Sequence, residues 1–249
     1  MAGETIPYCG PAPTPDTVWT SWNFDPFVIA ALLALIGIYS AYGLKGRASN
    51  LRFSAAIILL VVIFISPLCA LSSALFSARV FHHMLLVGVA APLLASVFAE
   101  TRSGASRFPV MVFVLHTAMI WLWHTPEPYA FALSGTLPYW LMELSLLFSG
   151  IAMWRAILNS QTGMGTVMSL LLGSIIQMGM LGALLTFATQ PLFEQHFATT
   201  MAFGLSPLSD QQLAGLLMWV PAALPYVLFA ILRFASFLGN GSGMERAKP

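Results

Sequence analysis

The side chains best suited to chemistry in this 249-residue chain are five histidines, two cysteines and one carboxylate that lies inside an apolar segment. The histidines and cysteines are His82, His83, His116, His124, His196, Cys9 and Cys69. The carboxylate is Glu143. An ionisable side chain inside a membrane helix is costly and usually marks a functional site. Glu143 therefore needs a partner, and we expect that partner to be His124 or His116.

Imidazole, thiol, thioether and carboxylate groups together match copper best. Cu(I) selects thiolate, thioether and imidazole ligands, whereas Cu(II) takes imidazole and carboxylate. We expect His83 and His124 to be the main copper ligands. The further candidates for metal ligands are His82, His116, Cys69 and Glu143. Each also has a structural interpretation, since a buried histidine is often only hydrogen-bonded and a cysteine is often a small apolar residue.

Two other interpretations of the same residues stay open. Cys9 and Cys69 could pair as a disulfide in an oxidising compartment. Two histidines at matched depth on facing helices could ligate a haem, so the main alternative is a haem-binding or quinone-reactive redox protein. A copper transporter is a weaker alternative, because it needs polar groups through the inner half of the bundle, where we find little besides Gln177.

Nucleophile–base constellations, phosphate-binding glycine loops and HExxH zinc motifs are not visible, so we expect no enzyme.

These side chains lie in or beside seven apolar segments, each near the ~20 residues that a helix needs to cross a membrane. The segments are Pro26–Leu44, Phe53–Leu71, Phe81–Ala99, Phe108–His124, Tyr139–Leu158, Gly165–Ala188 and Leu213–Leu238. The chain is 58% apolar and 8% charged, with a mean hydropathy of +0.83, whereas soluble proteins are about a quarter charged. The predicted fold is all-α, a polytopic membrane protein built as one bundle of seven transmembrane helices.

The basic residues are distributed unevenly between the two ends of this predicted bundle. Nine fall on one side, namely Lys45, Arg47, Arg52, Arg102, Arg107, Arg155, Arg233, Arg246 and Lys248. Arg79 alone falls on the other side, with most of the acidic residues. Because basic loops stay in the cytoplasm, the N-terminus is predicted outside and the C-terminus inside. Residues 1–25 would form an extended extracytoplasmic tail, residues 26–238 the membrane domain, and residues 239–249 a cytoplasmic tail.

On this predicted topology, the residues capable of chemistry lie mostly near the outer side of the membrane. His82 and His83 open the third helix, His124 closes the fourth, and His116 lies about 12 Å deeper on the same helix. His196 lies in an outer loop, where we expect little burial. The net charge of +1 leaves no basic face for a nucleic acid. Gly173, Gly179 and Gly182 predict close packing of the sixth helix.

Four sequence patches stand out together. They are Ser66-Pro67-Leu68, His83-Met84-Leu85-Leu86, the six residues Trp-Leu-Trp-His-Thr-Pro at 121–126, and the long stretch 206–221, which begins Ser-Pro-Leu-Ser-Asp-Gln-Gln. Together they resemble the caa3-type CtaG family of cytochrome c oxidase assembly proteins. The resemblance implies a seven-helix protein of the bacterial inner membrane that helps to mature a haem–copper oxidase.

The resemblance also implies partners and site residues. The partners would be the oxidase core subunits, a periplasmic copper donor and the lipid bilayer. The residues that carry over from the motifs are His83, His124, Asp210 and the neighbouring Gln211 and Gln212. The chain departs from the family pattern at three positions, where the family often has Asp, His and His and this chain has Cys69, Arg79 and Glu143.

The combined prediction is a non-enzymatic assembly factor that binds copper at the outer membrane face. His83 and His124 would hold the ion, with Cys69 or a methionine as a softer ligand. The ion would pass sideways to the oxidase within the bilayer. Arg79 would contact a carboxylate of the partner or mark the interface.

Overall fold

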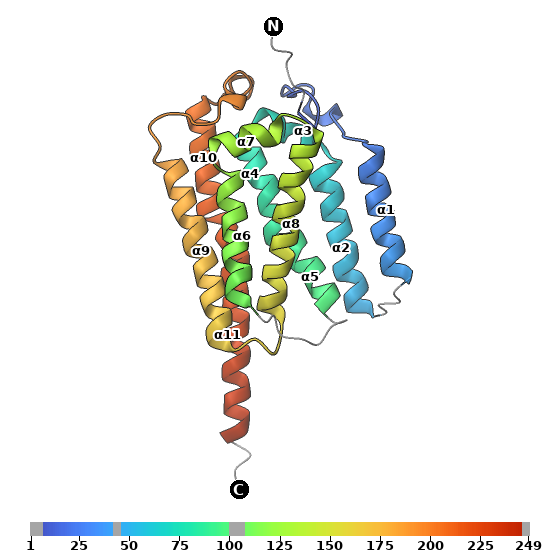
Figure 1. Cartoon of the computed structure of the whole chain (residues 1–249), viewed down its shortest axis with the longest axis vertical. Coiled ribbons are helices and arrows are strands. Elements are labelled where there is room, and N and C mark those ends of the chain that lie inside the picture. The colour runs from blue at the N-terminus through green and yellow to red at the C-terminus, as the bar shows by residue number, and fades with distance from the viewer. Residues whose placement is uncertain (1–6, 42–45, 100–107, 246–249) are drawn as a thin grey trace.

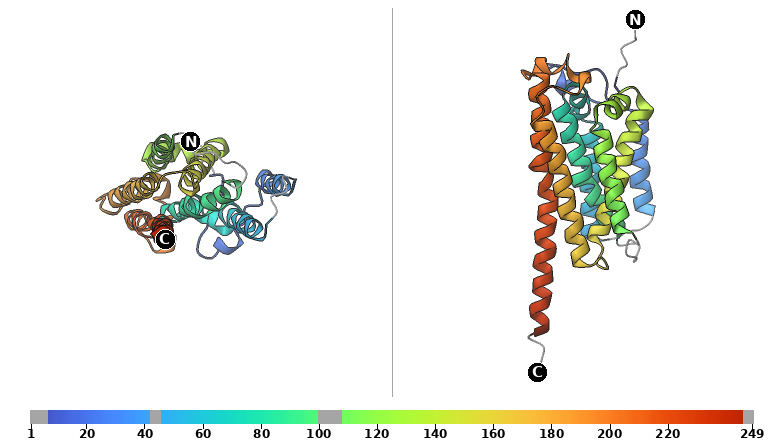
Figure 2. Two further views of the ribbon diagram at one scale, coloured as in Figure 1. Left: turned by 90° about the horizontal axis from the view of Figure 1, so that it is seen from below. Right: turned by 60° about the vertical axis from the view of Figure 1, so that its left-hand side comes forward.

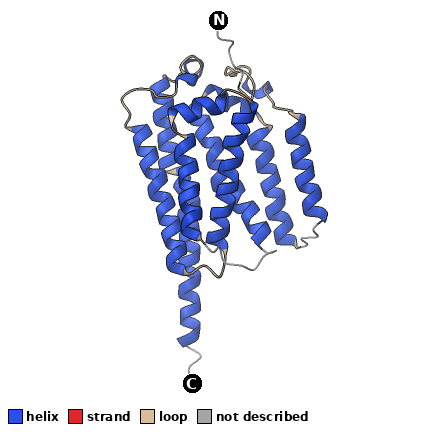
Figure 3. Ribbon diagram, in the orientation of Figure 1, coloured by secondary structure: helices blue, strands red, loops and turns tan. Residues whose placement is uncertain are grey.

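The computed structural model describes residues 7–41, 46–99 and 108–245, and these residues form helices joined by short turns, with no strand among them (Figure 3). The helices in chain order are η1 (Val18–Thr20), α1 (Pro26–Ala41), α2 (Arg47–Phe64), α3 (Pro67–Ala74), α4 (Phe76–Leu85), η2 (Leu86–Ala90), α5 (Ala91–Ala99), α6 (Pro109–Trp123), α7 (Pro126–Leu133), α8 (Thr136–Leu158), α9 (Met164–Thr186), η3 (Glu194–His196), η4 (Thr200–Phe203), α10 (Pro207–Trp219), η5 (Pro221–Ala223) and α11 (Leu224–Glu245). The predicted all-α class is confirmed for the residues described.

The long helices run side by side and form one bundle (Figure 1). The short helices α3 and α7 lie at one end of the bundle together with the N-terminal tail, and the C-terminus lies at the other end. Helix α11 extends well beyond the bundle at that second end (Figure 2). The short helices α3 and α7 and the N-terminal tail therefore gather at one end of the bundle.

The protein is a multi-pass membrane protein. Within the described residues, five helical segments are long and apolar enough to cross a membrane, namely Arg47–Phe64, Phe76–Val97, Thr136–Leu158, Met164–Phe187 and Pro207–Leu238. Two apolar helices beside them are shorter, α1 with 16 residues and α6 with 15. At 1.5 Å per residue these two span about 22–24 Å, less than the ~30 Å of a hydrocarbon core. The count of seven spans and the orientation stay predictions.

Prolines explain where the helices break. Pro67 begins α3, and the Ser66 side chain caps that helix by accepting a hydrogen bond from the backbone N–H of Leu68. A π-helical turn, η2, precedes Pro92, which cannot donate a backbone hydrogen bond to the turn before it. Pro221 ends α10 and begins the 3-10 turn η5. Each of these three prolines thus lies at a break or a distortion of the regular α-helix.

Helices α9 and α10 approach one another closely through glycines. A Cβ atom added at Gly215 would lie 2.6 Å from the carbonyl oxygen of Gly182, and one added at Gly182 would lie 2.7 Å from that of Gly215. Gly173 likewise packs under the ring of Phe113. The close packing predicted for the sixth apolar segment is therefore confirmed, because small residues let two helix backbones come together.

Several predicted element boundaries were wrong. Helix α4 begins at Phe76, so His82 and His83 lie inside it rather than at its start. Helix α10 begins at Pro207 instead of Leu213, so Asp210 and Gln211 belong to a helix and not to a loop. The segment predicted as a cytoplasmic tail from residue 239 continues α11 as far as Glu245. Helices α4 and α10 extend through polar residues that are satisfied by neighbouring parts of the bundle, which an apolar run cannot reveal.

A labelling experiment tests the orientation. We expect cysteine introduced at Ser134, which is exposed in the turn between α7 and α8, or at Ala198, which is exposed in the loop between η3 and η4, to react with a membrane-impermeant thiol reagent in intact cells. Cysteine at Gln161, which is exposed in the turn between α8 and α9, should be protected because the basic loops stay in the cytoplasm. The parent chain serves as the blank, since both of its cysteines are paired. Labelling at Gln161 from outside would reverse the topology. Ser103 and Lys248, which the charge argument also predicts to be protected, lie outside the described residues.

Candidate functional site

Helix α4 carries the centre of the site, and its position is set by α10. The carboxylate of Asp210 accepts hydrogen bonds from the backbone N–H groups of Phe76, at 2.7 Å, and Ser77, at 3.2 Å, and from the Ser77 hydroxyl. These are the first N–H groups of α4, which have no partner within the helix. A carboxylate at a helix N-terminus also interacts favourably with the helix dipole. Asp210 therefore caps and positions the histidine-bearing helix.

The neighbouring Gln211 holds the loop that follows α9. Its side-chain oxygen accepts a hydrogen bond from the backbone N–H of Leu192 at 2.7 Å, and its side-chain nitrogen lies 3.4 Å from the carbonyl oxygen of Leu185. Asp210 and Gln211 are both buried. These two of the residues named by the resemblance thus orient parts of the backbone around the site.

One face of α4 meets Glu143 of α8 in the buried interior. Arg79, His82 and His83 have the i, i+3, i+4 spacing that places side chains on the same helix face. Arg79 Nη1 lies 3.2 Å from Glu143 Oε1, His82 Nε2 3.3 Å from Oε2, and His83 Nε2 3.3 Å from Oε1. All four side chains are buried. The expectation that His124 or His116 would be the direct partner of Glu143 was wrong.

Arg79 is fully buried, so the expectation that it contacts a carboxylate of a partner protein was also wrong. Its guanidinium forms the ion pair with Glu143 and lies 5.2 Å from the centre of the Tyr139 ring. A cation above an aromatic face is stabilised by the ring quadrupole. Arg79 thus compensates the charge of Glu143 inside the protein, at a cost in desolvation that the pair must offset.

The structure brings His83 and His124 together from α4 and the end of α6. His83 Nδ1 lies 3.3 Å from His124 Nε2. His124 Nδ1 lies 2.7 Å from the carbonyl oxygen of Ile120. A carbonyl oxygen only accepts hydrogen bonds, so the proton of a neutral His124 belongs on Nδ1. The Nε2 lone pair of His124 consequently faces His83.

The second nitrogen of His83 is committed to Glu143. A carboxylate paired with arginine only accepts hydrogen bonds, so Nε2 of His83 carries its proton and donates to Oε1. A neutral His83 then presents the lone pair of Nδ1 to the lone pair of His124 Nε2, only 3.3 Å away. Two lone pairs at this distance repel one another unless a cation lies between them. The pair is therefore arranged to share one cation, either a proton or a metal ion.

This gap suits a metal ion held by imidazoles. Metal–imidazole bonds are about 2.0–2.1 Å long, so two of them span 3.3 Å at an angle of roughly 110°. A linear site would need about 4 Å, so the separation fits a bent site with a third ligand better. The pair alone supplies only two ligands, and no group of three or more His, Cys, Asp or Glu side chains within the described part of the chain is arranged to hold a metal ion.

The same geometry argues against a haem between these histidines. In bis-histidine ligation the iron and its macrocycle lie between the two imidazoles. The nitrogens here are only 3.3 Å apart, and the cavity that both residues line has a volume of about 100 Å³. That space is too small for a tetrapyrrole.

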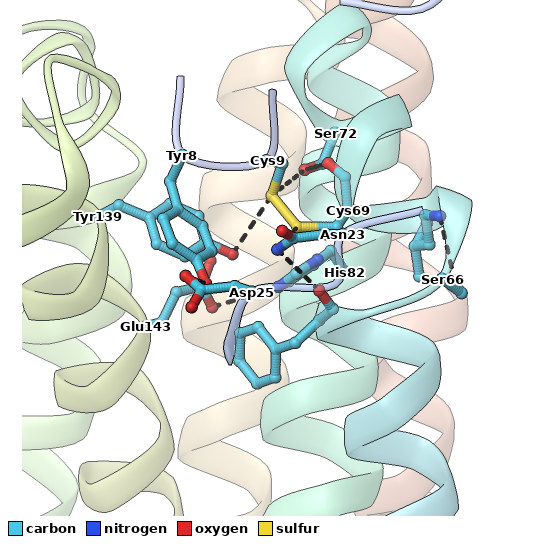
Figure 4. Close-up of a disulfide and its surroundings, with 12 residues drawn as sticks. Tyr8, Cys9, Asn23, Asp25, Ser66, Cys69, Ser72, His82, Tyr139 and Glu143 are labelled. Atoms are coloured by element: carbon cyan, nitrogen blue, oxygen red, sulfur yellow. Dashed lines mark hydrogen bonds and ion pairs between the residues drawn. A yellow bond between two sulfur atoms is a disulfide. The ribbon is translucent and has the colours of Figure 1, made fainter. Parts of the chain in front are cut away.

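Cys69 is bonded to Cys9 in a disulfide with an S–S distance of 2.06 Å (Figure 4). Of the two interpretations left open by the sequence, the structure therefore shows the disulfide. A disulfide sulfur is not a thiolate, so the expectation of Cys69 as a metal ligand is corrected for this oxidised form. The bond joins the N-terminal tail to α3.

The tethered tail covers the cluster at the end of the bundle that carries the N-terminus. Tyr8 stacks on Tyr139 with ring centroids 4.5 Å apart, and its hydroxyl donates a 2.5 Å hydrogen bond to Asp25 (Figure 4). Burial and this bond raise the pKa of Tyr8. Tyr139 in turn lies over Arg79. The tail, the aromatic pair and the buried ion pair thus form successive layers.

Removing the disulfide should show how much it contributes to the unfolding free energy of the protein. The bond closes a segment of 60 residues, and the chain-entropy relation gives a stabilisation of about 4 kcal/mol for a loop of this length. We expect the double variant Cys9→Ser/Cys69→Ser to lose unfolding free energy of that order, measured by tryptophan fluorescence during denaturation in detergent. A thiol reductant should lower the stability of the parent protein and leave the double variant unchanged. Equal stability of the two proteins would contradict a structural role for the bond.

The remaining histidines lie apart from the cluster. His116 is buried, and its Nδ1 lies 3.0 Å from the Ser149 hydroxyl, while its Nε2 has no hydrogen-bond partner among the described residues. His196 is also buried, with an exposed fraction of 2%, so the expectation of little burial was wrong. The Tyr129 hydroxyl lies 2.7 Å from His196 Nε2. Burial raises the pKa of Tyr129, so the hydroxyl keeps its proton and donates to the imidazole.

His196 gives the protein a predictable response to acid. Burial lowers the pKa of His196 to about 4, whereas an unfolded histidine titrates near 6.5. The unfolded chain therefore binds a proton that the folded chain excludes, and stability should fall as the pH drops from about 6.5 towards 4, by up to about 3 kcal/mol. We expect the variant His196→Gln to lose this part of the pH dependence in denaturation curves recorded between pH 4 and 7. An identical pH dependence in both proteins would show that His196 does not contribute.

Comparison with known proteins identifies the family. The profile of the cytochrome c oxidase caa3 assembly factor family matches residues 96–239, which is more than half of the chain. The chain belongs to this family. No curated protein and no solved structure is significantly similar to the chain. The caa3 assembly factor family thus confirms the resemblance seen in the sequence.

The matched segment of this caa3 assembly factor includes part of the site. His116, His124 and Glu143 lie within residues 96–239, as do Asp210 and Gln211. The α4 face with Arg79, His82 and His83 precedes it, as does the disulfide. The histidine pair therefore joins one residue from inside the matched segment with one from outside it.

Proposed function

We propose that this caa3 assembly factor binds copper between His83 and His124 and delivers it to a cytochrome c oxidase. The observation that carries the proposal is the pair of imidazole nitrogens, 3.3 Å apart in the buried interior, whose lone pairs face one another. Imidazole is a ligand for both copper oxidation states. The family supports the oxidase as the recipient.

The residues around the pair act by orienting it. Glu143 holds His83 through Nε2, and the carbonyl of Ile120 holds His124 through Nδ1. Such partners fix the tautomer and the ring orientation of a metal-binding histidine. Because only two protein ligands are in place, a third position is open to a ligand from the donor or the recipient. Exchange of ligands then moves the ion without any redox step or enzymatic reaction.

We further propose that the protein crosses the bacterial inner membrane seven times, with the N-terminus and the histidine pair on the outer side. The separation of charges supports this orientation. Arg47 begins α2, Arg155 lies near the end of α8 and Arg233 lies within α11, whereas the acidic Asp16 and Asp25 precede α1 and Glu127 lies in α7. A periplasmic protein would then supply copper from above the cluster. The oxidase core subunits would receive it within the bilayer.

The proposal is tested by the copper content of the oxidase. Deleting the gene should leave the oxidase subunits in the membrane but short of copper, measured by elemental analysis of the purified enzyme. Extra copper in the medium should partly restore the metal if the role is delivery. A deletion strain whose oxidase contains normal copper would contradict the proposal. If the oxidase lacks haem instead, the haem-related alternative would replace it.

A further inference from the structure

A second feature lies directly beside the histidine pair. His83 and His124 line a cavity of about 100 Å³ whose wall also contains Met84, Met178 and Met218. The three methionines come from α4, α9 and α10, so three separate helices each contribute one thioether. Methionine adapts easily to irregular gaps. The three methionines could fill this space, yet a cavity remains between them, so the cavity needs another explanation.

The backbone deviates from regular helix on both sides of this cavity. The π-helical turn η2 contributes Gly88, and the 3-10 turn η5 contributes Pro221. Single π-helical turns inside α-helices occur frequently at functional sites. Tyr226 also lines the cavity and is fully buried, and its hydroxyl has no hydrogen-bond partner among the described residues. The cavity is thus lined by a tyrosine whose hydroxyl is unsatisfied as well as by the three methionines.

We propose that this methionine cavity is a Cu(I) site, distinct from the histidine pair and adjacent to it. The inference rests on the proposed copper-binding function and names the oxidation state and the next ligands of the ion. Thioethers are soft, neutral ligands that select Cu(I) over the harder divalent ions. An ion at the histidine pair would reach the methionines by exchanging imidazole for thioether ligands, with no change in its charge.

The cavity also adjoins an exposed groove on the bundle. Gly88, Val89, Pro221 and Pro225 line both the cavity and a larger groove of about 860 Å³. The groove is bordered by exposed apolar residues such as Leu228. The methionine cavity therefore adjoins both the histidine pair and this exposed apolar groove, where a membrane-embedded recipient could take the ion.

Copper binding by the purified full-length protein tests the proposal. The protein would be loaded anaerobically with Cu(I) in ascorbate, which keeps the metal reduced without a thiol, and examined by elemental analysis and X-ray absorption. Both cysteines of the chain are in the disulfide, so a sulfur shell near about 2.3 Å can come only from methionine. We expect the parent protein to show such a shell.

The test variant is Met84→Leu/Met178→Leu/Met218→Leu, in which each change conserves volume and should be tolerated. Its matched control is Met142→Leu/Met153→Leu/Met168→Leu, which likewise replaces two buried methionines and one half-buried one, all outside the cavity. We expect the test variant to bind one Cu(I) fewer than the parent and to lose the sulfur shell, while the control keeps both. Should the triple variant fail to fold, Met218→Leu alone should reduce the intensity of the sulfur shell.

The outcomes separate this inference from the proposed function. Equal copper content and equal sulfur scattering in the test and control variants would overturn the methionine site, as would a parent protein without a sulfur shell. The histidine-bound copper would then remain as proposed. Conversely, if His83→Ala/His124→Ala keeps all of its copper with an unchanged sulfur shell, the histidine pair is not a ligand and the methionine site stands alone.

Discussion

Alanine at His83 or at His124 should remove the copper bound between the two imidazoles and leave the oxidase of the cell deficient in copper. Each change leaves only one imidazole at the gap of 3.3 Å. We expect the affinity to fall by more than about tenfold, since even the loss of a residue that only orients a metal-binding histidine costs 10–100-fold. Copper content by elemental analysis and oxidase activity in membranes are the two measurements.

His196→Ala provides the matched control for these variants. His196 is equally buried, but it hydrogen-bonds Tyr129 and none of the residues around the gap. The control should lose thermal stability and keep its copper, so that a loss of metal through general destabilisation would be recognised. His116→Ala shows whether a third imidazole takes part. If both single variants of the pair retain parental copper and oxidase activity, the proposed mechanism fails.

The second large effect is expected from separating Arg79 and Glu143. The two side chains are fully buried and 3.2 Å apart, so either one alone would leave an uncompensated charge inside the protein. We expect Arg79→Met or Glu143→Leu to lower the free energy of unfolding by about 3–5 kcal/mol, the cost typical of breaking a buried ion pair. The measurement is denaturation in detergent together with the amount of protein in the membrane.

The double variant Arg79→Met/Glu143→Leu distinguishes stability from function. Replacing both charges with apolar groups removes the uncompensated charge, so much of the lost stability should return. Copper binding should stay low, because Glu143 no longer orients His83. Glu143→Gln should weaken copper binding while the protein remains in the membrane. If Glu143→Leu alone improves both abundance and copper content, then Glu143 is only a tolerated buried carboxyl group.

The sequence predicted the elements better than their contacts. Apolar runs locate the long helices, because crossing a bilayer requires them, and the motif around Ser66 and Pro67 marks a true break between α2 and α3. Apolar runs cannot show where a helix continues through polar residues. Helix α10 therefore begins six residues earlier than expected, since Asp210 and Gln211 are satisfied by α4 and by the loop after α9.

The sequence predicted those parts of the site that depend only on the depth of a residue in the membrane. His83 and His124 were expected at matched depth on consecutive helices, and the structure places their nitrogens 3.3 Å apart. The partners of Glu143 depend instead on how α4 is rotated towards α8, which the sequence does not specify. The i, i+3, i+4 spacing of Arg79, His82 and His83 was the available signal for a shared helix face. No comparable signal in the sequence predicted the contact between Tyr139 and Arg79, since aromatic residues near a membrane surface usually form the interfacial belt.

The close crossing of α9 and α10 has a consequence for the position of His83 relative to His124. Gly182 and Gly215 leave no room for a side chain between the two backbones, so these helices cannot slide or rotate past one another without a clash. Asp210 lies a little over one turn before Gly215 on α10 and caps α4. The contact between Gly182 and Gly215 therefore fixes the position of α10 and, through Asp210, the position of the first turn of α4. A shift of α10 at this contact would move α4 and so change the distance between His83 Nδ1 and His124 Nε2, although neither glycine touches a histidine.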